Sequence, residues 1–144
     1  MKGQRQGFTL LELLVVVVVI GILASLAVPR FLKTVEKARI AEAKNWLGEM
    51  RSSEIRYRLE SSAYTTNLAL LDIDNPNNVT PRYYNYTAAL SDPGGCTAAG
   101  SATEPFWIVA TRVSDQGRPS PPPGVPPSYT VKLSDSGNLC DTLP

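Results

Sequence analysis

The chain contains no histidine among its 144 residues, and this absence restricts the chemistry that it can perform. Histidine is the commonest general base near neutral pH and a frequent zinc ligand, so its absence weakens the case for hydrolysis and for a zinc site. No combination of nucleophile, base and acid is visible in the rest of the sequence. We therefore expect a protein that is not an enzyme and has no cofactor.

The chain also lacks an excess of charge of either sign, because 14 basic residues nearly balance 13 acidic ones. Removing the first seven residues, which include Lys2 and Arg5, would change the formal charge from +1 to −1. After residue 60 the basic residues are few and scattered, namely Arg82, Arg112, Arg118 and Lys132. This distribution argues against a general nucleic-acid binder.

What the sequence does contain is a long apolar run, Phe8–Val28, with one charged residue, Glu12, near its start. About 20 apolar residues are enough to cross a bilayer. A carboxylate near the end of a spanning helix costs a few kcal/mol unless it has a partner. Because the run holds no other charge, the partner must come from outside the segment, which indicates assembly with other chains.

Three interpretations of residues 1–28 compete. The basic head followed by an apolar run is typical of a secretory signal peptide, but this run is longer than a signal core, and no clean small-x-small cleavage site follows it. An ordinary transmembrane helix fits the length. The positive-inside rule would then place the head in the cytoplasm and the C-terminal part outside, although Arg30 and Lys33 mildly oppose this orientation. Neither interpretation accounts for Glu12.

The third interpretation rests on the segment GFTLLEL at residues 7–13, which resembles the class III signal of type IV prepilins. Gly21, Pro29 and Phe31 extend the resemblance, which is close over about residues 3–45 and only general afterwards. In that family a dedicated peptidase cuts after the glycine and then N-methylates the new first residue. The resemblance therefore implies cleavage between Gly7 and Phe8 and methylation of Phe8.

The same resemblance implies a role for Glu12 in assembly. In related filaments the equivalent carboxylate meets the terminal amine of a neighbouring subunit. Such a pair in low dielectric offsets both desolvation costs only when the two subunits are in register. The alternative is a glutamate that reaches the membrane interface and has no partner.

The helix is expected to continue to about residue 60 and to bend on the way. Pro29 cannot donate a backbone hydrogen bond, and Gly21 lowers helix propensity, so the stretch between them is expected to kink and to melt locally in a filament. Membrane helices often tolerate both residues, which is the alternative. From Phe8 to Glu60 the helix would be about 80 Å long, far more than a small globular domain needs.

Beyond Pro29 the sequence has the apolar periodicity of an amphipathic helix. Its apolar face consists of Ile40, Ala43, Leu47, Met50 and Tyr57. Basic residues outnumber acidic ones eight to five between Arg30 and Glu60. They form either a solvated face or a contact with acidic patches on neighbouring subunits.

The C-terminal part has the pattern of a small sheet. Three strands are predicted at Tyr83–Leu90, Phe106–Val113 and Tyr129–Leu133. They are expected to form an antiparallel meander on the apolar helix face, which makes the fold class α+β, with a long N-terminal helix packed against a small antiparallel sheet as in pilins.

The chain has only two cysteines, Cys96 and Cys140. Because a membrane segment precedes them, we expect an oxidising compartment and one disulfide between them, worth roughly 3–4 kcal/mol for a loop of this length. Two free buried thiols are the alternative. No Cys-x-x-Cys spacing is present, which argues against redox catalysis.

Two weak calcium-like patterns compete with ordinary polar turns. Asp72-Ile73-Asp74-Asn75 resembles half of a calcium loop, but Pro76 replaces a ligand. Asp135, Asn138 and Asp141 are a second group of oxygen ligands. We expect polar turns at both and no metal.

The expected organisation is a leader at residues 1–7, a transmembrane and filament-core helix at 8–28, its amphipathic continuation at 29–60, and a C-terminal β domain at 61–144 with a disulfide-closed region. Before assembly the chain is expected to be a single-pass protein of the inner membrane, and afterwards part of an extracellular filament.

The resemblance implies a structural subunit of a type IV pilus that serves adhesion, twitching motility or DNA uptake. Its implied partners are identical subunits, the membrane, a prepilin peptidase, an inner-membrane assembly platform and a cytoplasmic ATPase. The alternatives are a type II secretion pseudopilin and a minor or competence pilin, and only the last would bind nucleic acid. Major pseudopilins usually carry a C-terminal calcium loop and no disulfide.

Overall fold

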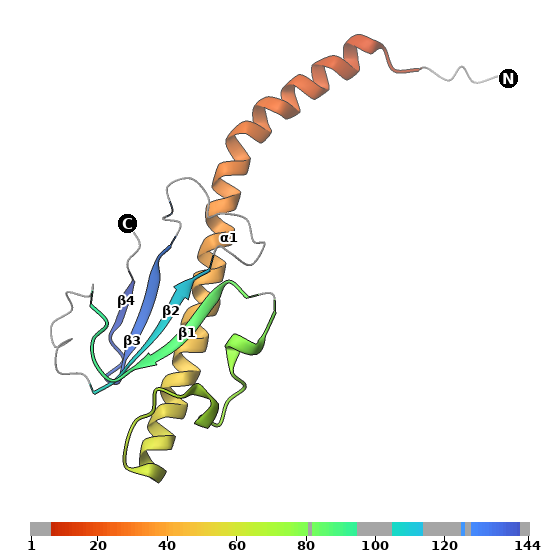
Figure 1. Cartoon of the computed structure of the whole chain (residues 1–144). Coiled ribbons are helices and arrows are strands. Elements are labelled where there is room, and N and C mark those ends of the chain that lie inside the picture. The colour runs from red at the N-terminus through yellow and green to blue at the C-terminus, as the bar shows by residue number, and fades with distance from the viewer. Residues whose placement is uncertain (1–6, 81, 95–104, 114–124, 126–127, 142–144) are drawn as a thin grey trace.

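A computed structural model describes residues 7–80, 82–94, 105–113, 125 and 128–141 of the chain. One long helix, α1 (Leu10–Ser61), is followed by two short 3-10 helices, η1 (Leu68–Leu70) and η2 (Pro76–Asn78), and then by a four-stranded sheet. The sheet packs against the C-terminal half of α1, and the N-terminal half projects beyond it (Figure 1). This arrangement confirms the expected α+β fold class.

The sheet is an antiparallel meander with the strands in chain order. Its strands are β1 (Tyr84–Ala89), β2 (Trp107–Arg112), β3 (Thr130–Ser134) and β4 (Leu139–Asp141). The three predicted strands are confirmed, with each of their six ends one residue from its predicted position. The fourth was not predicted, because it is only three residues long and follows a polar turn in which Gly137 has a φ of 90°.

The ends of α1 have recognisable capping residues. Thr9 is the N-cap, with an extended backbone, and its hydroxyl accepts a hydrogen bond from the backbone N–H of Glu12. At the other end Ser62 adopts the left-handed conformation, with a φ of 62°, and donates its backbone N–H to the carbonyl of Arg58 at 2.8 Å. Both devices satisfy backbone groups that a helix end leaves unpaired.

The helix continues through Gly21 and Pro29 without interruption. Its N-terminal half follows a curved path (Figure 1). Near the proline, the Ser25 hydroxyl donates to the carbonyl of Ile22 at 2.7 Å, and the Thr34 hydroxyl donates to that of Arg30 at 3.1 Å. Such side-chain bonds to the preceding turn accompany helix bending. The sharper kink and the melting in a filament stay predictions.

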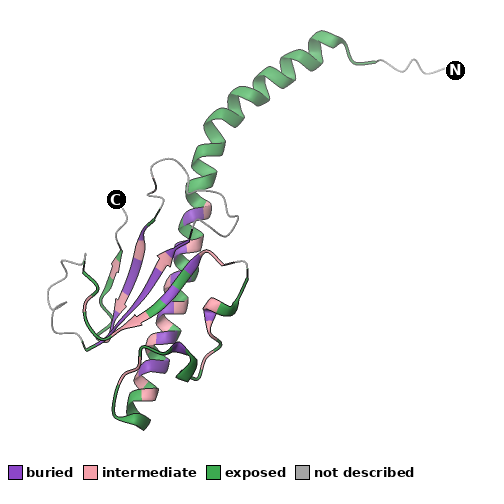
Figure 2. Cartoon of the chain, viewed as in Figure 1, coloured by how far each residue is buried: buried purple, intermediate pink, exposed green. Residues whose placement is uncertain are grey.

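The core lies between the sheet and one face of α1 (Figure 2). Four residues of the predicted apolar face are buried, and Tyr57 is half-buried against them. The buried face is longer than predicted, however, and has a glutamate near each end. Six of its members recur at alternating steps of four and three residues: Glu36, Ile40, Ala43, Leu47, Met50 and Glu54. Ser53 is buried beside them.

Candidate assembly site on the N-terminal helix

The N-terminal half of α1 is covered by nothing in the described structure. Every residue from 7 to 34 is exposed (Figure 2). The large apolar side chains of this segment range in exposure from 43% at Leu32 to 84% at Phe8. An 18-residue window has a mean hydropathy of 2.9, so this helix is long and apolar enough to cross a membrane. A helix that is apolar all round must be covered by lipid or by other protein.

Glu12 lies in the first turn of this uncovered helix. The spacing Thr9-x-x-Glu12 is that of a capping box, a signal that our sequence analysis missed. The Thr9 hydroxyl accepts from the Glu12 backbone N–H at 3.2 Å. The Glu12 side chain is exposed and makes no ion pair with any described residue. Together with Phe8, Leu13 and Val16 it lines a shallow groove at the start of the helix.

Two glycines of the motif have open space around them. A Cβ atom placed on Gly7 or on Gly21 would meet nothing within 4 Å. Packing within the described chain therefore does not require glycine at either position. If glycine is needed there, the need comes from another molecule that approaches the backbone closely.

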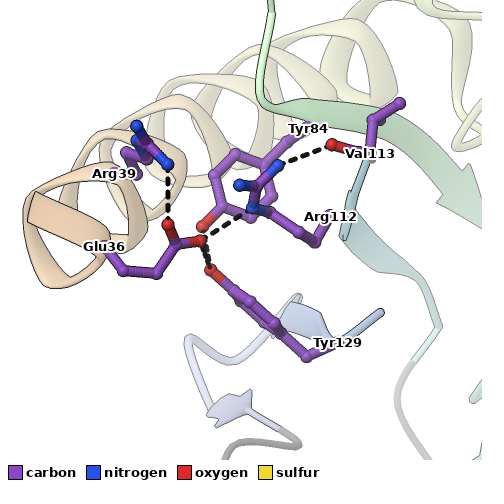
Figure 3. A network of polar contacts seen from close by, with 6 residues as sticks. All are labelled: Glu36, Arg39, Tyr84, Arg112, Val113 and Tyr129. Carbon is purple, nitrogen blue, oxygen red and sulfur yellow. Dashed lines mark hydrogen bonds and ion pairs between the residues drawn. The ribbon is translucent and has the colours of Figure 1, made fainter. Parts of the chain in front are cut away.

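A buried polar network joins α1 to the sheet, two residues after the end of the exposed segment 7–34 (Figure 3). The Arg112 Nε donates to Glu36 Oε1 at 2.7 Å, and the Tyr129 hydroxyl donates to the same oxygen at 2.8 Å. Arg39 forms an ion pair with the other oxygen of Glu36, also at 2.8 Å. Glu36 and Arg112 are 2% and 3% exposed. We call Glu36, Arg112 and Tyr129 the latch.

The electrostatics of the latch favour the charged carboxylate. Burial raises the pKa of Glu36, but hydrogen bonds from Arg112 and Tyr129, together with the charge of Arg112, outweigh it and leave the pKa below its ordinary value. The Tyr84 and Tyr129 hydroxyls are 2.5 Å apart, and burial raises the pKa of Tyr84 to about 12. Burial also raises the pKa of Tyr129, so both tyrosines stay protonated and the charged groups of the latch at neutral pH are Glu36 and Arg112.

The glutamate at the other end of the buried face has a less favourable environment. Glu54 Oε2 accepts from the backbone N–H of Thr65 at 3.1 Å, and its Oε1 has no hydrogen-bond partner among the described residues. Burial raises the pKa of this carboxyl, and the Thr65 hydrogen bond compensates only in part. A carboxyl with a raised pKa stabilises the fold while it is protonated, and that contribution is lost as the pH rises through its folded-state pKa.

We therefore expect Glu54→Gln to stabilise the protein at pH 7 by roughly 1 kcal/mol, the scale of one pKa unit, because a neutral amide is easier to bury than a carboxylate. The amide keeps an acceptor for Thr65 and removes the buried charge. Unfolding by urea at pH 7 and at pH 4 would measure the effect, which should shrink at the lower pH. Equal stability of the two proteins at pH 7 would show that burial of the Glu54 carboxyl does not destabilise the fold.

The residues of the two calcium-like patterns interact with other groups. The Asp72 carboxylate accepts two hydrogen bonds from Arg56, at 2.7 and 2.8 Å, and one from Ser53, and these lower its pKa to about 2. Asp135 accepts from Tyr64, and Asp141 pairs with Lys44 at 3.5 Å. In the described part of the chain, no three His, Cys, Asp or Glu side chains are grouped to hold a metal ion.

Cys140 in β4 is disulfide-bonded. Its expected partner, Cys96, lies outside the described residues. The Cys96–Cys140 pairing therefore stays a prediction.

Comparisons with known proteins agree with the N-terminal motif. Residues 2–28 match the prokaryotic N-terminal methylation motif. The type II secretion system core protein G of Vibrio cholerae serotype O1 is 41% identical over 88 residues, which are 58% of this chain and 60% of that protein. The type IV wide pilus major component PilA4 of Thermus thermophilus is 29% identical over 107 residues, which are 74% of this chain and 81% of that protein. No solved structure matches the chain.

The extent of these matches varies. The chain spans 60% or less of the length of the core protein G relatives from Vibrio cholerae, Dickeya chrysanthemi and Pectobacterium carotovorum. The core protein G of Pseudomonas aeruginosa is 33% identical over 101 residues, and the match spans 71% of that protein. Through this similarity and the methylation motif at its start, the chain belongs to the family of type IV pilin-like proteins, which includes core protein G of type II secretion systems.

Proposed function

We propose that this chain is the repeating structural subunit of a filament that is assembled from the inner membrane, and that Phe8–Val28 forms the filament core. The observation that carries this proposal is the exposure of every residue from 7 to 34, in a segment that is almost entirely apolar up to Val28. Burial of that surface against neighbouring copies, at about 25 cal/mol per Å², contributes many kcal/mol per subunit. The sheet domain would then lie on the outside of the filament.

Before assembly the chain would be a single-pass membrane protein with the sheet domain outside the cytoplasm. A prepilin peptidase would cut between Gly7 and Phe8 and methylate the new N-terminus. The match to the methylation motif supports this processing. So does the open space around Gly7, because no contact in the described structure accounts for a glycine at the cut.

Glu12 would set the register between subunits. Once the leader is removed, Phe8 carries a cationic amine one helical turn before Glu12. In the uncleaved chain Glu12 makes no ion pair with any described residue. Its proposed partner is the Phe8 amine of a neighbouring subunit, which comes within reach only on assembly. A pair of this kind in low dielectric stabilises the filament only when both charges are in place, so it favours the correct axial stagger between subunits.

Two kinds of filament fit the family. The core protein G sequences have the higher identities, up to 41%, which favours the pseudopilus of a type II secretion system. PilA4 aligns over more of both chains, and Cys140 is disulfide-bonded, which favours a surface pilus with roles in adhesion, motility or DNA uptake. In either case an assembly platform in the inner membrane and a cytoplasmic ATPase would supply the work of extraction.

Electron microscopy of the native cells and of a strain that lacks this chain would test the proposal. A surface pilus predicts long external filaments that disappear with the deletion. A pseudopilus predicts no such filaments at native expression and a loss of protein secretion in the deletion strain. A deletion strain that keeps both its filaments and its secretion would contradict the proposed function.

A further inference from the structure

From Arg30 onward, helix α1 carries a basic residue at every seventh position. These residues are Arg30, Lys37, Lys44, Arg51 and Arg58, and we call them the basic row. From Lys37 onward, each member of the row comes one position after a residue of the buried or half-buried helix face. These preceding residues are Glu36, Ala43, Met50 and Tyr57. Successive residues lie about 100° apart around a helix, so the row flanks the sheet rather than facing it.

The lower part of the basic row is partnered by the domain itself. Lys44 Nζ pairs with Asp141 in β4 at 3.5 Å. Arg51 donates its Nε to the backbone carbonyl of Asp135 at 2.7 Å, and Arg58 donates to the Tyr64 hydroxyl at 2.8 Å. These three cations thus fix the helix against β4, the turn before it and the segment after the helix.

The upper part of the row is different. Arg30 and Lys37 are exposed, as is Lys33, which lies one helical turn from each of them. Their side chains make no hydrogen bond or ion pair with the residues that the structure describes. Glu36, the carboxylate nearest to them along the helix, is turned inward to Arg112 and Tyr129 (Figure 3). Three cations therefore stand together without a counter-charge; we call them the upper cations.

Their distance from the apolar run matches the headgroup layer of a bilayer. The run ends at Val28, so Arg30 and Lys33 lie roughly 3–8 Å beyond it along the helix axis, and Lys37 about 13 Å beyond it. Each headgroup layer is roughly 5–8 Å thick, and long basic side chains can reach back toward it. Phe31, which is 66% exposed, sits among them as an apolar contact at the same level.

A second copy in the same membrane does not supply the missing counter-charge. It would sit at the same depth and present its own upper cations at this level. On α1 the next exposed carboxylates, Glu42 and Glu49, lie farther from the apolar run. Phosphate groups of lipids, by contrast, lie at the level of the upper cations over the whole membrane surface.

From this placement we infer that Arg30, Lys33 and Lys37 bind anionic phospholipid headgroups in the leaflet from which the sheet domain emerges. The inference rests on the proposed membrane-spanning state of the chain. The contact holds the unassembled subunit at a fixed depth, and it is released when the subunit is drawn into a filament. Each cation near an anionic surface is expected to contribute roughly a fivefold preference for anionic lipid at low salt.

Quenching by brominated lipids tests this inference on the full chain. Phe31→Trp places a fluorescent reporter among the upper cations, and the parent chain corrects for Trp46 and Trp107. The protein is placed in vesicles in which either phosphatidylglycerol or phosphatidylcholine is brominated, at the same mole fraction. At low salt we expect brominated phosphatidylglycerol to bind next to this headgroup reporter at least fivefold more strongly than brominated phosphatidylcholine. We expect this preference to fall as the salt concentration rises.

Two matched variants separate the upper cations from the rest of the row. Arg30→Gln/Lys33→Gln/Lys37→Gln should remove the preference, whereas Lys44→Gln/Arg51→Gln/Arg58→Gln, with the same change in charge, should keep it. Equal quenching by the two lipids in the Phe31→Trp protein would overturn the inference, and so would a preference that survives the first triple substitution.

A second reporter, Val17→Trp, separates failure of the inference from failure of the proposed function. In a spanning helix, the indole introduced at position 17 lies in the acyl chains and is quenched by both brominated lipids. If this acyl-chain reporter is quenched and the headgroup reporter shows no lipid preference, the headgroup contact is wrong and the membrane-spanning state stands. If the acyl-chain reporter is not quenched at all, the chain does not span the membrane, and both proposals fail.

Discussion

Replacing Glu12 with glutamine is expected to stop filament assembly while the chain still inserts into the membrane. The substitution keeps the shape of the side chain and removes its charge, so the amine of the neighbouring subunit is left buried without a partner. Breaking a buried ion pair costs about 3–5 kcal/mol, which weakens the affinity between subunits by roughly 100- to 4000-fold at each contact. Glu12→Val should have the same effect.

The measurement is the amount of this chain in sheared or sedimented filaments relative to the amount in the membrane fraction. Glu42→Gln is a suitable control, because Glu42 is an exposed carboxylate of the same helix outside the apolar run. It should assemble normally. Normal filaments from the Glu12→Gln protein would show that register is set by apolar packing alone.

Replacing Glu36 with alanine is expected to destabilise the domain by about 3–5 kcal/mol, because Arg112 then remains buried beside Tyr129 without its counter-charge. Arg112→Met should have a comparable effect for the converse reason. Removing both charges together, as Glu36→Leu/Arg112→Met, should restore much of the lost stability. A double-mutant cycle in urea, built from Glu36→Leu, Arg112→Met and their combination and followed by the near-ultraviolet circular dichroism of the buried aromatic residues, measures this coupling.

The pH dependence of the wild-type protein gives an independent check on the latch. The pKa of Glu36 is lowered in the folded state, so its contribution to stability is fully present above the unfolded-state value of about 4.5. The contribution is lost as the pH falls through the lower, folded-state pKa. The Glu36→Ala protein should lose less stability than the wild type over this range. Additive effects of the two single substitutions, with no coupling, would contradict the description of the latch.

The latch also bears on assembly. Glu36 follows the exposed segment 7–34 almost directly along α1, so the latch fixes the sheet domain relative to the helix that is proposed to form the filament core (Figure 3). A domain that moved on its helix would present a variable surface to its neighbours. We therefore expect the latch variants to insert into the membrane as the wild type does and to enter filaments in smaller amounts.

The fold was predictable from the sequence where local patterns determine it. Ile40, Ala43, Leu47 and Met50 recur at helical spacing, and all four are buried. The strands Tyr84–Ala89 and Trp107–Arg112 carry the alternating or continuous apolar residues that such patterns require. In each case burial dictates the residue types, on one face of α1 and β1 and on both faces of β2, so the pattern can be read without knowledge of the partner.

The buried glutamates were not predictable in this way. The sequence pattern alone places Glu36 on a solvated charged face, because its partner Arg112 lies 76 residues away and nothing local marks the pair. One signal was available, since Glu36 and Glu54 fall in the same three- and four-residue spacing as Ile40 and Met50. A carboxylate on that spacing predicts a buried polar contact, although the sequence does not say with which residue.

The candidate assembly site was found from its motif rather than from physical pattern alone. The apolar run and the isolated charge of Glu12 indicated other chains, but the cut at Gly7 and the methylation of Phe8 came from family resemblance. The structure of one subunit adds that this chain covers neither Glu12 nor the apolar run in its described part. We propose that the contacts that complete the site lie on another molecule.

The mass and N-terminal sequence of the polypeptide isolated from its native cell test the central claim most directly. We predict a chain that begins at Phe8, lacks residues 1–7 and carries one added methyl group on its terminal amine. A polypeptide that still begins at Met1, or one that is cut near residue 28 as a secretory signal would be, leaves Glu12 without the amine that it is proposed to meet. Either result would contradict the account.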